Sequence, residues 1–163
     1  MKIAVISTPT FAVGVSGTQG LQGYGGLEQL AWQQAAGLAA KGHEVFLMAP
    51  DGSTCPGATV IPIGPAGQTN EHMAFQKYWK KLLECDAVID NSWAKFAYLL
   101  KQEGTLNAPV LGVCHAPVGT MFNSPPPVPK PCIVCISEDQ ASHWRALHGK
   151  ADARVCYNGV DPD

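Results

Sequence analysis

The stretch Gly23-Tyr-Gly-Gly-Leu-Glu28 connects an apolar strand and its long loop to an amphipathic helix. The strand is predicted at residues 2–8, where a continuous apolar run ends in small polar residues, as in strands buried on both faces of a parallel sheet. Glycines at a helix start let an anion approach the free backbone N–H groups. The stretch therefore predicts a phosphate-binding corner, with a flexible helix-start loop as the alternative.

The helix after this corner is predicted over residues 27–41 because side chains of one kind recur there at the helical period. Its stripe is apolar apart from one glutamine and consists of Leu27, Leu30, Ala31, Gln34, Leu38 and Ala39. Gly42 stands where a left-handed C-terminal cap is common.

Strands and helices continue to alternate along the chain. Further helices are predicted from Asn70, from Ser92 as an N-cap with Trp93 on the apolar stripe, and from Ser137, which forms a capping box with Gln140. Further strands are predicted at residues 44–49, 58–63, 86–90, 109–115, 132–136 and 153–157. This order predicts an α/β fold, a Rossmann-like doubly wound parallel sheet in one domain over residues 1–163.

The charge and hydropathy of the chain limit the classes of partner that it is expected to bind. The net charge is −2 and there is no run of Lys or Arg, which gives no support for binding to nucleic acid or to an anionic membrane. No segment approaches the roughly 20 apolar residues of a membrane span, so any membrane contact would be peripheral. The six cysteines follow no predicted signal peptide, which favours free thiols in the cytoplasm.

A metal site is not expected at Cys132-x-x-Cys135. An offset of three residues on a strand puts the two thiols on opposite faces of the sheet, and no second pair follows at metal-ligand spacing. We expect both cysteines to be buried thiols.

Ligands of doubly wound sheets bind beyond the carboxyl ends of the strands. That rule selects the loop at residues 9–26, Asp51, the run Asp90-Asn91-Ser92, and His115. His115 is interpreted either as a histidine bonded to a backbone carbonyl or as a hydrogen-bonding group or base beside a reacting sugar. Asp51 and Asp90 are candidate catalytic carboxylates, although we favour the interpretation that they cap the following turns.

Four segments, in this order and spanning nearly the whole chain, resemble the N-terminal domain of family-four glycosyltransferases of the GT-B fold. The first runs from Gly25 through the predicted helix to Val45. The others are Val113-Cys-His-Ala-Pro117, Ile136-Ser-Glu138 and Tyr157-Asn-Gly-Val-Asp161. The first and last segments are the more specific of the four.

The resemblance implies a retaining glycosyltransferase of the hexosyltransferase type. Its donor substrate is a nucleotide-diphosphate sugar, and it needs neither a metal ion nor another cofactor. Gly25 and Gly26 would contact the donor diphosphate, and His115 would be the catalytic residue facing the sugar. The candidate acceptor or cleft residues are Asp90, Asn91, Ser92, Ser137 and Glu138.

The resemblance also implies a partner domain. In this family the nucleotide-sugar domain follows the N-terminal one and supplies the basic side chains, so we expect this chain to be the acceptor-side half and to be inactive alone. Two alternatives remain open: a small nucleotide- or dinucleotide-binding module with Asp51 near a ribose, and half of a sugar-nucleotide epimerase. The dinucleotide fingerprint is a poor match, because Glu28 occupies the place of its third glycine.

Overall fold

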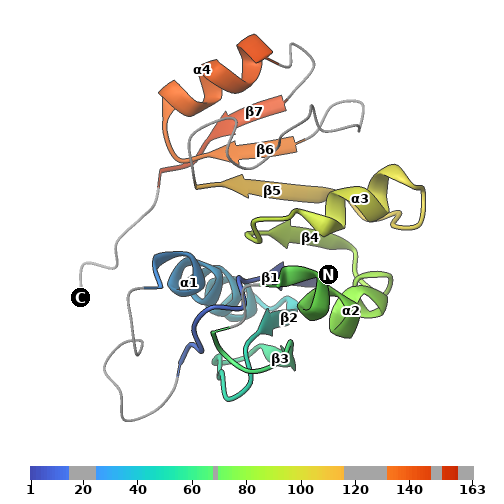
Figure 1. Cartoon of the computed structure of the whole chain (residues 1–163). Helices are drawn as coiled ribbons and strands as arrows, with labels where there is room; N and C mark the ends of the chain where they lie inside the picture. Colours follow the sequence, from blue (N-terminus) through green and yellow to red (C-terminus); the bar gives the residue numbers. More distant parts are fainter. Residues whose placement is uncertain (15–24, 68–69, 116–131, 148–151, 158–163) are drawn as a thin grey trace.

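The protein folds around one parallel β-sheet. The computed structural model describes residues 1–14, 25–67, 70–115, 132–147 and 152–157. Within these residues the sheet has seven strands in the order β3-β2-β1-β4-β5-β6-β7, and each neighbouring pair is parallel. Figure 1 shows the sheet running from β3 at the bottom to β7 near the top. The strands are Lys2–Ile6 (β1), Glu44–Ala49 (β2), Thr59–Pro62 (β3), Ala87–Asp90 (β4), Val110–Cys114 (β5), Cys132–Cys135 (β6) and Asp152–Val155 (β7).

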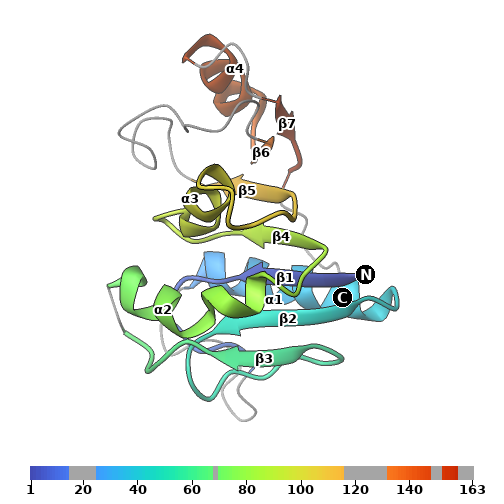
Figure 2. The ribbon, with the colours of Figure 1, turned by 90° about the vertical axis from the view of Figure 1, so that its right-hand side faces the viewer.

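The helices lie on both faces of the sheet, so the doubly wound prediction is confirmed. They are Gly26–Ala40 (α1), Glu71–Leu82 (α2), Phe96–Gln102 (α3) and Glu138–Leu147 (α4). Alternate residues of β1 and β2 pack against α1 on one face and against α2 on the other. Figure 2 shows α2 and α3 in front of the strands and α1 behind them. The strand order reverses between β1 and β4, where ligand sites of such sheets are found.

The amphipathic stripe predicted for α1 is only partly right. The residues of this helix that are buried are Glu28, Ala31 and Ala35, whereas Leu27 and Leu30 are half-buried. The alanines allow the helix to lie close to the strands, and the larger leucines are displaced to its sides. A carboxylate therefore occupies a place that an apolar stripe would assign to a leucine.

The helix predicted from Ser92 begins later, at Phe96. Lys95 precedes it in the left-handed region, with φ of 52°, and no side chain caps the helix there. The hydroxyl of Ser92 instead accepts a hydrogen bond from the backbone N–H of Lys95, over 3.1 Å, and closes a turn. Trp93 consequently lies outside the helix and is 45% exposed.

Gly112→Ala should lower the free energy of unfolding by about 1–3 kcal/mol, because it overpacks the sheet beneath α3. A Cβ at position 112 would lie 2.5 Å from Cε2 of Tyr98. The Tyr98 ring is held in place, since its hydroxyl accepts from the Gly112 N–H over 2.9 Å and donates to the carbonyl of Cys132. Urea unfolding monitored by circular dichroism measures the change.

Gly37→Ala is the matched control for this substitution. Apart from its two chain neighbours and the adjacent backbone of α1, no heavy atom lies within 4 Å of a Cβ added at Gly37. Alanine favours a helix over glycine by about 1 kcal/mol, so this variant should be more stable than the wild type. Equal effects of the two alanines would contradict the overpacking argument.

Candidate functional site

A pocket of about 430 Å³ opens at the carboxyl edge of the sheet. It draws residues from the segments after β1, β4, β5 and β6 and from the first turn of α1. Its walls are Thr8, Thr10, Phe11, Gly26, Leu27, Glu28, Trp93, His115 and Ile136. Gly26 and His115, which are far apart in the sequence, therefore line the same pocket.

His115 directly follows β5 and is half-buried at the pocket. Its Nε2 lies 3.2 Å from Oδ1 of Asn91. This partner is a side-chain amide and not the backbone carbonyl that one interpretation anticipated. Burial, and secondarily the charge of Lys95, lower the pKa of His115 to about 4. The imidazole is therefore neutral at pH 7 and can offer one donor and one acceptor.

Glu28 is a pocket residue that the sequence interpretation missed. Only 3% of it is exposed, and it accepts a hydrogen bond from the hydroxyl of Thr8. Its place in the first turn of α1 is favourable, because the helix dipole stabilises a negative charge there. A carboxylate at this point accepts hydrogen bonds from hydroxyl groups and repels phosphate oxygens. The signal in the sequence was its position two residues after the glycine pair.

The glycine pair forms the start of α1. Gly25 is the N-cap residue, with φ of −116° and ψ of 68°, and no side chain caps the helix. Its carbonyl accepts from the N–H of Gln29 over 2.9 Å. Gly26 is exposed and lines the pocket. Gly26 and Glu28 therefore both line the pocket, whereas Gly25 is buried and is not among the residues described as lining it.

Asp90 and Ser92 form a buried turn directly before Trp93, and neither of the two is among the described residues that line the pocket. Oδ1 of Asp90 accepts from the N–H and the hydroxyl of Ser92, over 2.9 and 2.6 Å. Nζ of Lys95 donates to the carbonyls of Asp90, over 3.0 Å, and Ser92. Asp90 is fully buried, and the interpretation of it as a turn acceptor agrees with these contacts.

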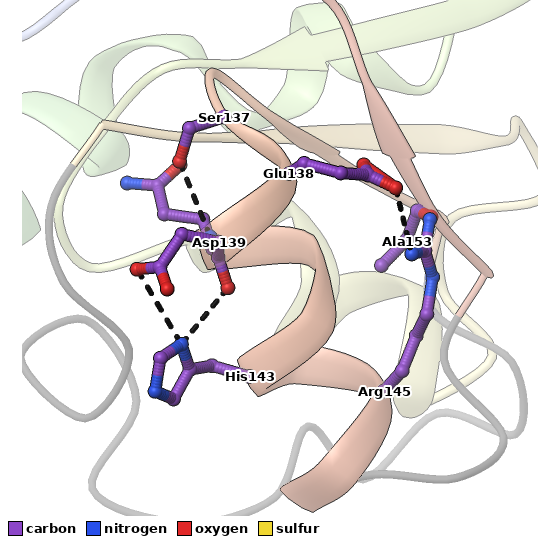
Figure 3. Close-up of polar contacts among 7 residues, drawn as sticks. Ser137, Glu138, Asp139, His143, Arg145 and Ala153 are labelled. Carbon is purple, nitrogen blue, oxygen red and sulfur yellow. Dashed lines mark hydrogen bonds and ion pairs between the residues drawn. The ribbon is translucent and has the colours of Figure 1, made fainter.

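Ser137 and Glu138 belong to the start of α4. Ser137 Oγ accepts from the N–H of Gln140 over 3.2 Å, as in the predicted capping box. Gln140 Oε1 accepts in return from the N–H of Ile136 over 3.0 Å, one residue before Ser137. Figure 3 shows Glu138 extending toward Arg145, and their side chains approach to 3.3 Å. Ile136, directly before Ser137, is one of the residues that line the pocket.

Asp51 follows β2 and joins that end of the strand to the segment after β3. Its Oδ1 accepts from the N–H of Gly64 over 3.1 Å, and its own N–H donates to the carbonyl of Gly64 over 2.8 Å. The carboxylate thus bonds to the segment after β3 and not to the turn that directly follows it, so the expected cap of the following turn is not what this side chain forms. It does not line the pocket that contains His115.

The thiols of Cys132 and Cys135 stand at the two ends of β6. Cys135 is buried and Cys132 is half-buried, and burial raises the pKa of Cys135 to about 11. In the part of the chain that the structure describes, no group of three or more His, Cys, Asp or Glu side chains is placed to hold a metal ion. The helices in that part are all too short or too polar to cross a membrane.

A parallel sheet whose order reverses beside a pocket at its carboxyl edge defines a Rossmann-like domain. The family model described as Glycosyltransferase Family 4 matches residues 24–163, which is most of the chain. The chain therefore belongs to that family. A comparison with curated proteins finds no match.

Proposed function

We propose that the chain is the N-terminal, acceptor-side domain of a retaining glycosyltransferase that uses a nucleotide-diphosphate sugar. The observation that carries the proposal is the shared pocket of Gly26 and His115 at the switch point of the sheet. Within the pocket, the backbone amides at the glycine start of α1 would meet the donor diphosphate, and positive charge from a second domain would offset the repulsion from Glu28. The neutral His115 and the carboxylate of Glu28 would hydrogen-bond to hydroxyl groups of the sugar.

The acceptor would bind beside the donor, on the side of Trp93. A second hollow of about 640 Å³ is lined by Asn70, Glu71, His72, Trp93, Ala94 and Phe96, and Trp93 lines both hollows. The exposed part of its indole offers an apolar face for a sugar ring, with a polar edge. Glu71 fixes this wall, because its carboxylate accepts from the N–H groups of Trp93 and Ala94 over 2.9 and 2.6 Å.

The charge of the pocket supports a requirement for a second domain. The described lining residues include the acid Glu28 but neither Lys nor Arg. A departing nucleotide diphosphate accumulates negative charge that amide groups of a single helix turn stabilise only in part. The remaining positive charge would come from a C-terminal nucleotide-sugar domain, which makes this chain one half of the site.

The chain alone should therefore not transfer sugars and should bind nucleotide sugars only weakly. Isothermal titration with a panel of UDP-, GDP- and ADP-sugars, together with a turnover assay that detects free nucleoside diphosphate, measures both properties. The same assays on the chain joined to its C-terminal domain should show turnover with one donor. Turnover by the isolated chain would overturn the requirement for a second domain.

A further inference from the structure

Asn91 connects three elements at the point where the strand order reverses. It directly follows β4, and its backbone N–H donates to the carbonyl of Ile6 in β1 over 3.0 Å. Its side-chain Nδ2 lies 3.1 Å from the same carbonyl oxygen and 2.9 Å from Oε1 of Gln34 in α1. Asn91 is only 1% exposed, so its amide group depends on these protein partners.

These contacts fix which way the amide of Asn91 faces. A backbone carbonyl oxygen only accepts, so the atom beside the Ile6 carbonyl must be the amide nitrogen. The amide oxygen is thereby turned to His115, where it lies 3.2 Å from Nε2. Since that oxygen also only accepts, Nε2 must carry a proton. In a neutral imidazole the other nitrogen, Nδ1, is then an acceptor.

We propose that Asn91 is a positioning residue that holds His115 in the Nε2–H tautomer, so that Nδ1 accepts a hydrogen bond from a hydroxyl group of the bound ligand. Gln34 assists by accepting the second amide hydrogen of Asn91. The identity of that ligand as a sugar rests on the proposed function, whereas the tautomer does not. The depressed pKa of His115, about 4, supports a neutral ring under ordinary conditions.

The arrangement also accounts for two features of the sequence. Gln34 is the polar member of an otherwise apolar stripe on α1, and its carbonyl oxygen is the partner of the buried Asn91 amide. Asn91 stands between Asp90 and Ser92, whose side chains bond to each other, so Asn91 is the member of this run that contacts His115.

The tautomer of His115 determines which ligand groups the pocket can bind. A ligand hydroxyl can donate to Nδ1, whereas a deoxy or fluoro group at the same carbon cannot.

Long-range proton–nitrogen correlation spectra of the nitrogen-15-labelled chain at pH 7 report the tautomer directly, because the protonated and unprotonated ring nitrogens resonate far apart. The signals of His115 are identified by their loss in His115→Gln. We expect the Nε2–H form in the wild type, a mixture of tautomers in Asn91→Ala, and recovery of Nε2–H in Asn91→Asp, whose carboxylate still accepts from Nε2. A merely structural role for Asn91 would change stability without changing the tautomer.

An Nδ1–H form in the wild type overturns the proposal, and this result needs no variant to fold. An unchanged tautomer in folded Asn91→Ala overturns it as well. The kcat/KM of the chain joined to its C-terminal domain separates the tautomer from the proposed function. If His115 is in the Nε2–H form but the joined protein transfers no sugar from any nucleotide sugar, the proposed function is rejected and the tautomer stands. Transfer by a protein whose His115 is Nδ1–H would reject the tautomer alone.

Discussion

Lys95→Met should lower the free energy of unfolding by about 2–5 kcal/mol, because it leaves two buried carbonyl groups without their donor and removes a buried positive charge near the Asp90 carboxylate. Lys95 is 1% exposed and Asp90 is fully buried. The lysine ammonium group also donates to the carbonyls of Asp90 and Ser92, which would lose a partner. Methionine retains the length of the side chain and the left-handed backbone at this position, so the charge and its hydrogen bonds are the main change. Denaturant unfolding measures the effect.

Two further variants isolate the charge. Lys95→Met combined with Asp90→Asn should recover part of the lost stability, since it also removes the buried negative charge with which Lys95 interacts. Lys77→Met, at an exposed position of α2, should change the free energy of unfolding by less than about 0.5 kcal/mol. A Lys95→Met protein as stable as Lys77→Met would contradict the argument. Because the charge of Lys95 lowers the pKa of His115, Lys95→Met should also raise that pKa.

The layout of the fold follows from local patterns. The apolar runs of β1 and β2 are long enough to be read as strands buried on both faces, and the element order then requires a doubly wound sheet. The side chain of Asn70 caps α2 as predicted, by accepting from the N–H groups of His72 and Met73. The start of α3 was wrong because Ser92 is engaged by Asp90, so that its cap closes a turn before the helix.

The sequence predicts a site residue only where that residue stands at the end of a strand or the start of a helix. His115 and Gly26 stand at such positions, and both line the same pocket. The Glu28–Thr8 contact and the chain from Gln34 through Asn91 to His115 depend on separations of 20 to 57 residues. Such pairs are set by the order of the strands and by which helix covers the switch point. Neither periodicity nor capping patterns contain that information.

His115→Ala in the chain joined to the proposed C-terminal domain should lower kcat/KM for the nucleotide sugar by about 5–150-fold, because loss of a hydrogen bond that leaves a buried partner unsatisfied costs about 1–3 kcal/mol. The proposed role of His115 beside the sugar is the reason, since alanine removes the acceptor at Nδ1 and leaves Oδ1 of Asn91 without its donor. Steady-state kinetics measure the loss. The exposed His143 of α4, whose Nδ1 contacts the carbonyl of Asp139 over 2.8 Å, offers a matched control. His143→Ala should retain the wild-type kcat/KM.

The dependence of activity on pH is a second, independent test of the protonation state of His115. The pKa of His115 is depressed to about 4, so the ring stays neutral as the pH falls from 8 to 5 and gains its proton only near pH 4. Activity that needs the neutral ring should therefore persist through this window and decline on its acid side. Lys95→Met removes one cause of the depression, so in that variant the acid limb should move to higher pH. An acid limb near the ordinary histidine pKa of about 6.5 in the wild type would contradict a buried, neutral His115.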